Sequence, residues 1–171
     1  ASNDNLNVAR READIAIRLA RPASGDFLIR KLAGVGFALY GAARGDLVVS
    51  AGDWVAYNED LDHTPEMRRL HAMLGEGRIR LRSNSLRGLV RAVAGGIGHG
   101  LLPCFVADAD PGLVRLSGAE PMLYRELWML IHPDTRPLAR VAATADWLVE
   151  RFDAEAASFA GTAPSPRTAP L

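Results

Sequence analysis

The sequence predicts an α/β protein with largely parallel sheets, because stretches typical of buried strands alternate with amphipathic helices. Two further observations support this class. The 171 residues are 49% hydrophobic and only 6% aromatic, which suits the packed core of one domain or of two small lobes. Glycine-rich turns separate several of the helical and extended stretches. We therefore expect a folded chain and not a disordered one.

The first elements are a helix and two strands. Asp4 or Asn5 can cap a short helix that carries apolar residues on one side, namely Leu6, Ala9 and Ala13. Residues 15–19 then alternate apolar side chains with smaller or charged ones, as a buried strand does. An extended run over residues 32–42 contains glycines at Gly34 and Gly36, which permit a bend or a close backbone approach.

The middle of the chain repeats the strand and helix pattern. A short strand is expected around residues 54–57, followed by a helix with Thr64 as its cap and Pro65 in its first turn. Its apolar residues recur at helical spacing. The stretch "GRIRLRSNS" alternates apolar residues with three arginines, which predicts a strand with one face in solvent.

The second half contains a further helix and several strands. Apolar residues recur at steps of three and four after Leu86, so we expect a helix that ends near Gly95. Short buried strands are expected in "GLLPCF" and "GLVRLSG", and a longer one over residues 126–131. An amphipathic helix follows in "RPLARVAATADWLVERF". From residue 158 onward the composition is rich in Pro, Ala, Ser and Thr, so we expect a flexible tail over 158–171.

The glycines of "GGIGHG" do not form a phosphate-binding loop. Such a loop follows a strand and opens a helix, so that backbone N–H groups at the helix N-terminus face the anion. Here the glycines close a helix and precede a strand, so the negative end of the helix dipole points at them. We interpret them as a tight helix-to-strand connection.

The opposite end of that helix is a candidate anion site. Ser83, Asn84 and Ser85 place hydroxyl and amide groups among backbone N–H groups at the positive end of the helix dipole. A carboxylate suits such a place. Plain helix capping explains the same three residues, and from spacing alone it is the favoured alternative.

Composition and spacing argue against several other functions. Lys plus Arg equal Asp plus Glu at 20 each, so no global field attracts nucleic acid or an anionic membrane. The four histidines have no metal-ligand spacing, and the single Cys104 is interpreted as a small core residue. No run is long enough for a membrane span. The chain lacks a nucleophile elbow or a credible acid–base pair, so we expect no enzyme, no metal and no cofactor.

Four ordered segments resemble the effector-binding region of LysR-type transcriptional regulators. They are "READIAIRLARP", "DWVAYNEDL", "LRSNSLRGLVRAVAGGIGHGLLPCFVADADPGLVRL" and "RELWMLIHPDTR", and the match runs from about Asn5 to Phe152. The resemblance implies two Rossmann-like subdomains of the type 2 periplasmic-binding-protein kind, joined by crossover strands. Subdomain I would comprise residues 1–31 and 122–157, and subdomain II residues 32–121.

The resemblance also implies parts of the family that lie outside this sequence. The family's helix-turn-helix domain, its linker helix and the opening β-α-β part of subdomain I have no counterpart in these residues, so we expect a fragment with an incomplete first subdomain. Any contact with DNA would be made through the helix-turn-helix domain. The resemblance further implies a cytoplasmic protein that forms homodimers or homotetramers and makes no contact with a membrane.

The family's effector-contacting positions fall on seven residues, which are Ser83, Asn84, Ser85, Pro103, Phe105, Arg18 and Leu19. Arg18 can give a charge-assisted contact to an effector carboxylate, although an ordinary surface role is equally compatible with the sequence. Phe105 can supply an apolar wall. We therefore expect the effector-sensing and oligomerisation domain of a LysR-type regulator that binds a small anionic metabolite between its lobes. The alternative is a stand-alone periplasmic-type solute-binding protein.

Overall fold

The computed structural model describes residues 13–22, 25–43 and 52–163. Its main sheet has the strand order β1-β7-β2-β5, and β6 also pairs with β2. These strands are β1 (Ile15–Arg18), β2 (Leu28–Ala42), β5 (Gly100–Pro103), β6 (Leu113–Arg115) and β7 (Leu123–Ile131). The β2 strand has 15 residues, which corresponds to about 50 Å of extended chain. It is long enough to pair with strands at both ends of the molecule.

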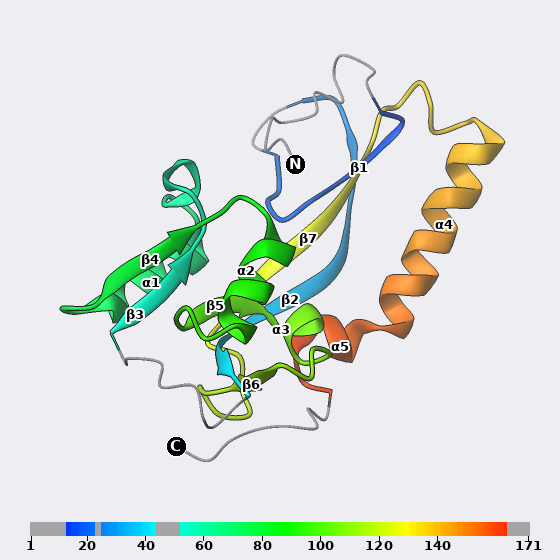
Figure 1. Cartoon of the computed structure of the whole chain (residues 1–171). Helices are drawn as coiled ribbons and strands as arrows, with labels where there is room; N and C mark the ends of the chain where they lie inside the picture. The colour runs from blue at the N-terminus through cyan, green and yellow to red at the C-terminus, as the bar shows by residue number, and fades with distance from the viewer. Residues whose placement is uncertain (1–12, 23–24, 44–51, 164–171) are drawn as a thin grey trace.

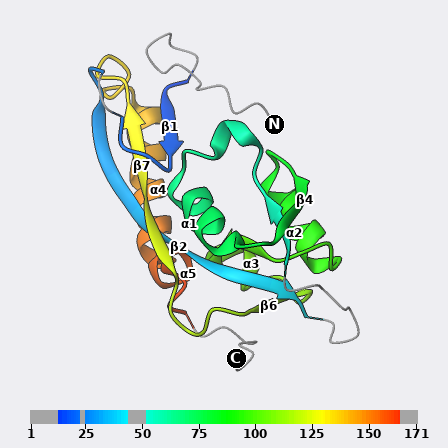
Figure 2. The same cartoon turned by 90° about the vertical axis from the view of Figure 1, so that its left-hand side faces the viewer.

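The paired strands β2 and β7 connect two lobes. They run side by side from Leu28↔Ile131 to Phe37↔Leu123, and the other elements gather at either end of this pair (Figure 1). We call the end with β1 and helix α4 (Ala139–Ala154) the first lobe. The second lobe holds β3 (Asp53–Ala56), β4 (Arg78–Arg82), β5, β6 and the helices α1 to α3. Figure 2 shows the long pair curving along one side, with α1, α2 and β4 on the other.

The helices of the second lobe are α1 (Pro65–Leu74), α2 (Leu86–Ala94) and α3 (Cys104–Ala107), and a 3-10 turn at Glu59–Leu61 precedes α1. The predicted helices after Thr64 and Leu86 are confirmed. Two apolar clusters fill this lobe, one beneath α2 and one between α1 and the β2–β7 pair. A third cluster lies under α4 in the first lobe. The apolar faces that the periodicity indicates are therefore buried at three places.

The expectation of largely parallel sheets is wrong. Within the described residues every pair in the main sheet is antiparallel, and only β3 and β4 form a parallel ladder, with a parallel bridge between Trp54 and His99 beside it. The reason is the long β2 strand. Its neighbours β5, β6 and β7 each run against it. Alternation of helices and strands along the sequence does not specify which strands become neighbours.

Several element boundaries also differ from the sequence-based expectation. The β2 strand begins at Leu28 and not at residue 32, and β7 begins at Leu123. The strand expected in "GLLPCF" ends at Pro103, since Cys104 and Phe105 already belong to α3. The helix expected near the start of the chain falls mainly on residues 1–12, which lie outside the described residues.

The segment expected to be a flexible tail is structured where it is described. Ser158–Ala160 belong to α5 (Ala156–Ala160), and Phe159 packs 4.7 Å from Phe105 and 4.8 Å from Phe152 between ring centroids. The carbonyl of Gly161 accepts a hydrogen bond of 3.2 Å from the buried Arg115. The remaining tail residues, 164–171, lie outside the described part.

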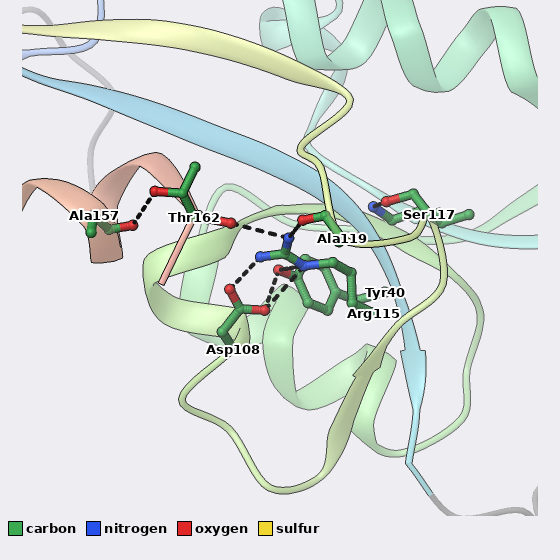
Figure 3. A network of polar contacts seen from close by, with 9 residues as sticks. Tyr40, Asp108, Arg115, Ser117, Ala119, Ala157 and Thr162 are labelled. Carbon is green, nitrogen blue, oxygen red and sulfur yellow. Dashed lines mark hydrogen bonds and ion pairs between the residues drawn. The ribbon is translucent and has the colours of Figure 1, made fainter. Parts of the chain in front are cut away.

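Arg115 is the centre of a polar network inside the second lobe (Figure 3). Its guanidinium donates to both carboxylate oxygens of Asp108, to the Tyr40 hydroxyl and to the carbonyls of Ala119 and Gly161. The Tyr40 hydroxyl in turn donates to Asp108 at 2.8 Å. Burial raises the pKa of Tyr40 far above its usual range, so the phenol stays protonated as this bond requires.

Candidate functional site

The carboxyl ends of three strands in the second lobe form one edge. The backbone N–H of Ser83, just after β4, donates to the carbonyl of Ala56 at the end of β3, and Val55 donates to the carbonyl of His99 just before β5. The three strands therefore end on the same side of the lobe. Crevices at the carboxyl ends of adjacent strands are where α/β folds commonly bind ligands.

Ser83, Asn84 and Ser85 lie at this edge and lead into α2. The Oγ of Ser85 accepts from the backbone N–H of Gly88 at 3.3 Å, and the Oγ of Ser83 accepts from the N–H of Ser85 at 3.1 Å. Ser85 is thus the N-cap of α2, in agreement with the capping alternative, and Ser83 stabilises the turn that precedes the helix. A hydroxyl that accepts one bond keeps its own proton for donation, so capping and ligand binding are compatible.

An ion-pair network braces the same edge from the β4 side. Arg82 donates to the carbonyl of Tyr57 at 2.8 Å and to the carboxylate of Asp62 at 2.9 Å, and His71 lies 3.1 Å from Asp62. Hydrogen bonds from Arg82 and then His71 hold the pKa of Asp62 below its ordinary value. The other two arginines of β4 are exposed and pair with Asp53, so only Arg82 turns towards the edge.

Pro103 and Phe105 lie where β5 passes into α3. Pro103 is buried and pairs with Phe37 across the sheet. Phe105 is half-buried and stacks on Phe159 of α5, which stacks in turn on Phe152 of α4. This row of aromatic rings joins the second lobe to the helix that covers the first.

Arg18 and Leu19 lie on the other side of the molecule's centre, at the end of β1. Arg18 pairs with Trp128 of β7 in the sheet register. Leu19 packs against the same apolar cluster as Phe105, and its carbonyl accepts a hydrogen bond of 3.0 Å from Arg125. Leu19 is thus the predicted residue that connects the two sides of the candidate site.

A cavity of about 350 Å³ opens between the lobes. Its lining comes from three segments: the chain after β1, the turn into α1, and the start of β7. The lining residues are Leu19, Ala20, Arg21, His63, Thr64, Pro65, Tyr124, Arg125, Glu126 and Trp128. The size is that of a small-molecule site.

A buried ion pair adjoins this cavity. Arg125 of β7 donates to the Glu66 carboxylate of α1 at 2.7 Å, and the two side chains are only 13% and 6% exposed. The pair therefore joins the crossing strand to the second lobe. The second carboxylate oxygen of Glu66 is buried, with no hydrogen-bond partner in the described structure. Burial and the nearby Glu66 carboxylate raise the pKa of Tyr57, at the end of β3, to about 12.

The sequence-based site and the cavity overlap only in part. Of the seven predicted residues, Leu19 lines the cavity. Ser83, Asn84 and Ser85, which we call the serine edge, lie at the strand ends of the second lobe, as do Pro103 and Phe105. Sequence reasoning missed Glu66, Arg125 and Arg21. One available signal was Arg125 itself, a charged residue at the start of a strand that is otherwise largely apolar.

The described side chains offer little for metal chemistry. No group of three or more His, Cys, Asp or Glu residues within the described ranges is placed to hold a metal ion. No helix in those ranges combines the length and apolar character that crossing a membrane requires. The cavity and the edge at Ser83, Asn84 and Ser85 instead offer hydroxyl, guanidinium and apolar groups.

Two lobes joined by crossing strands, with a cavity between them, define a ligand-binding domain of the type 2 periplasmic-binding-protein-like class. The chain belongs to the LysR substrate binding domain family, whose model matches residues 2–153. The family is one of transcriptional regulators, so the alternative of a stand-alone solute-binding protein is not favoured.

A curated relative and several solved structures agree with this family. The chain is 36% identical over 156 residues to the Mau operon transcriptional activator of Paracoccus denitrificans, covering 88% of this chain and 53% of the relative. It thus spans about half the length of that relative.

Two solved regulatory domains share the fold. That of CrgA, a LysR-type regulator from Neisseria meningitidis, has a TM-score of 0.69 and 17% identity, over 88% of this chain and 81% of that one. The regulatory domain of CcmR from Synechocystis PCC6803, in complex with 2-PG, has a TM-score of 0.63 and 14% identity, over 84% and 76%. The likeness confirms the predicted fold class.

Proposed function

We propose that this LysR effector-binding domain senses a small organic anion between its lobes and serves as the sensing and oligomerisation part of a DNA-binding transcriptional regulator. DNA would be contacted through a helix-turn-helix domain outside these 171 residues. The regulator would act in the cytoplasm as a homodimer or homotetramer. The domain would bind its effector without chemical change to it, so it is not an enzyme.

The observation that carries this proposal is the position and charge of the cavity. It is lined by the chain after β1, the start of β7 and the turn into α1, so a ligand there touches both lobes. Arg125 is paired with Glu66, and the one carboxylate in the lining, Glu126, is paired with Lys31, each at 2.7 Å, so Arg21 leaves this group of charges with an excess of positive charge. An anion is therefore favoured over a cation.

We propose that the predicted edge residues complete the site. Ser83, Asn84 and Ser85 would donate neutral hydrogen bonds to the effector, with Pro103 and Phe105 as the apolar wall at the second lobe. Arg18 and Leu19 would face them from the first. Support comes from the apolar cluster that Leu19 and Phe105 share, and from Tyr57, which lies at the same edge and whose pKa responds to the charge of Glu66.

A ligand that contacts both lobes favours the arrangement in which both contacts are made. The proposed subdomain limits, residues 1–31 with 122–157 and residues 32–121, put one crossing within β2 and the other immediately before β7. A change in the angle between the lobes would then be transmitted along these strands to the rest of a full regulator, and would bias its DNA binding.

The proposal is tested first by binding. Thermal-shift measurements on the 171-residue chain would compare small carboxylates, such as shikimate and phenylacetate, with their uncharged carboxamides. We expect stabilisation by carboxylates alone. Equal stabilisation by both members of each pair, or by neither, contradicts an anion-sensing domain.

A second experiment tests the serine edge. Ser83→Ala combined with Ser85→Ala should weaken binding of the best carboxylate in calorimetry. Ser117→Ala is the matched control, since its Oγ accepts a backbone bond from Leu39 away from the cavity. If the double variant binds as wild type does, the serine edge is not part of the site.

A further inference from the structure

We infer that Arg125 is the residue that receives the effector's carboxylate, that Glu66 holds Arg125 in position, and that the preferred effector carries a hydrogen-bond donor beside its carboxylate. This inference rests on the proposed function and names the ligand class of that same site. The three parts follow from one buried ion pair between α1 and β7.

Arg125 is placed to bind an anion at the cavity. Two hydrogen bonds fix the guanidinium from two sides, with Nη1 on Glu66 and Nη2 on the carbonyl of Leu19. A guanidinium has five N–H donors, and these bonds use two of them. Arg125 is among the residues that line the cavity, and we assign the remaining donors to a ligand there. Bidentate binding of a carboxylate is the arrangement that a fixed guanidinium favours.

The other cations near the cavity are less suitable. Arg21 lies over the Trp128 ring, 5.4 Å from its centroid, which occupies one face of its guanidinium. Lys31 pairs with Glu126, and both side chains are about half exposed, so water screens their charge. Arg125 is the most buried of these groups, and a contact to it is made in a less polar environment.

Glu66 supplies the second feature, an unused acceptor. One oxygen of its carboxylate binds Arg125, and the other is buried without a partner in the described structure. A buried acceptor left without a hydrogen bond is costly, so such groups are rare and call for an explanation. A donor on the ligand would supply the missing bond. Because both oxygens belong to one carboxylate, this donor must lie close to the group that Arg125 binds.

The geometry therefore describes a class of ligand. Arg125 takes the carboxylate, Glu66 takes a neighbouring hydroxyl, and Leu19, Pro65 and Trp128 provide apolar walls for the remainder. The free oxygen of Glu66 is covered by protein atoms, so the ligand's hydroxyl reaches it only when the lobes adjust around the ligand. Binding would then be coupled to the relative position of the lobes, as sensing requires.

Three related probes test this class on the 171-residue chain. Phenylacetate carries the carboxylate alone, mandelate adds a hydroxyl beside it, and phenylacetamide lacks the charge. Calorimetry should show the order mandelate, phenylacetate, phenylacetamide from tightest to weakest. Arg125→Gln should weaken binding of both acids by about tenfold or more, since a charge-assisted bond is lost. Arg125→Lys should restore part of the affinity.

Glu66→Gln tests the positioning role with a distinct readout. The glutamine keeps the shape but removes the charge that fixes Arg125 and replaces one acceptor oxygen with a donor. We expect the preference for mandelate over phenylacetate to disappear. Arg30→Gln is the matched control, because Arg30 lies on the neighbouring strand β2 and lines a different cavity. It should leave all three affinities unchanged, and circular dichroism should show every variant folded.

The outcomes separate this inference from the proposed function. If the acids bind wild type and Arg125→Gln equally, Arg125 is not the anion contact, while the sensing role stands. If mandelate and phenylacetate bind wild type with equal affinity, the donor requirement is wrong. If neither acid binds wild type although shikimate stabilises the chain, the ligand class is overturned. If no carboxylate stabilises the chain at all, both proposals fail.

Discussion

Two arginine–carboxylate pairs among the described residues, both largely buried, differ in how completely their hydrogen-bonding groups are satisfied. Arg115 is 2% exposed in its side chain, and it bonds Asp108, Tyr40 and two backbone carbonyls within one lobe. Arg125 and Glu66 join a crossing strand to α1 beside a cavity, and one oxygen of Glu66 lacks a partner in the described structure.

The difference separates a structural pair from the pair that we propose binds the effector. In the Arg115 network, Arg115, Tyr40 and Asp108 hydrogen-bond one another, and Arg115 also binds the segment after α5 to the second lobe. The network therefore stabilises one arrangement of the chain. The Glu66–Arg125 pair leaves acceptor and donor capacity at the boundary between lobes, where a ligand can use it. Incomplete hydrogen bonding in a buried pair is therefore the more useful guide to function in this molecule.

The largest effect is expected from Arg115→Met. The variant loses the hydrogen bonds that Arg115 donates to Asp108, to the Tyr40 hydroxyl and to the carbonyls of Ala119 and Gly161. It also leaves the Asp108 carboxylate without its counter-charge. We expect the free energy of unfolding to fall by about 3 kcal/mol or more, measured by urea denaturation. A loss no larger than that of the surface variant Arg30→Gln would show that the network is not structural.

The second prediction concerns the Glu66–Arg125 pair. Replacing both partners, as Glu66→Leu with Arg125→Met, removes the charges together and fills similar space. Because paired apolar substitutes leave no uncompensated charge, we expect the stability to stay within about 1 kcal/mol of wild type. Binding of mandelate in calorimetry should nevertheless be lost.

The corresponding double variant of the structural pair provides the contrast. Asp108→Leu with Arg115→Met still strips the donors from the carbonyls of Ala119 and Gly161 and leaves the buried Tyr40 hydroxyl without its acceptor, so it should remain strongly destabilising. If both double variants are equally stable, the distinction between a structural and a binding pair does not hold.

A smaller effect is expected at the start of α2. Ser85→Ala removes the cap on Gly88 and should cost about 1 kcal/mol of unfolding free energy. Thermal melting followed by circular dichroism measures this. Ser85→Asn, which keeps a capping oxygen, should recover most of the loss. Failure of Asn to recover it would mean that Ser85 stabilises the helix by something other than its cap.

The smallest effect is a dependence on pH at Asp62. Bonds from Arg82 and His71 depress the pKa of this carboxyl below 3.8, so its ionised form stabilises the fold above about pH 4. That contribution is lost as the pH falls through the folded pKa. Asp62→Asn should thus be less stable than wild type at neutral pH, and the gap should narrow under acid. A gap of the same size at neutral and acid pH would contradict a stabilising role for these bonds.

Local features were predictable from the sequence to a large extent. The helix after Leu86 and its cap at Ser85 follow from apolar spacing and small polar residues, and the structure reproduces them. These features depend on residues close together in the chain. The order of strands and helices was predictable for the same reason.

Long-range features were not predictable in the same way. The antiparallel sheet depends on which strands meet β2, and spacing along the chain carries no such information. Glu66 and Arg125 are 59 residues apart and come together only after folding. The short α5 has too few residues to show a helical period, and Phe159 alone marks its packing. The helix over Ala156–Ala160 was missed for that reason.

The most direct test follows Arg125 itself while a ligand binds. Side-chain ¹⁵N–¹H spectra of the 171-residue chain would be recorded during a titration with mandelate, and the Arg125 Nε–H signal assigned by its absence in Arg125→Lys. We predict that this signal shifts progressively with mandelate and stays in place with phenylacetamide. Backbone signals that move with mandelate while the Arg125 signal does not would contradict an anion contact at Arg125, because the ligand would then bind without the charged residue between the lobes.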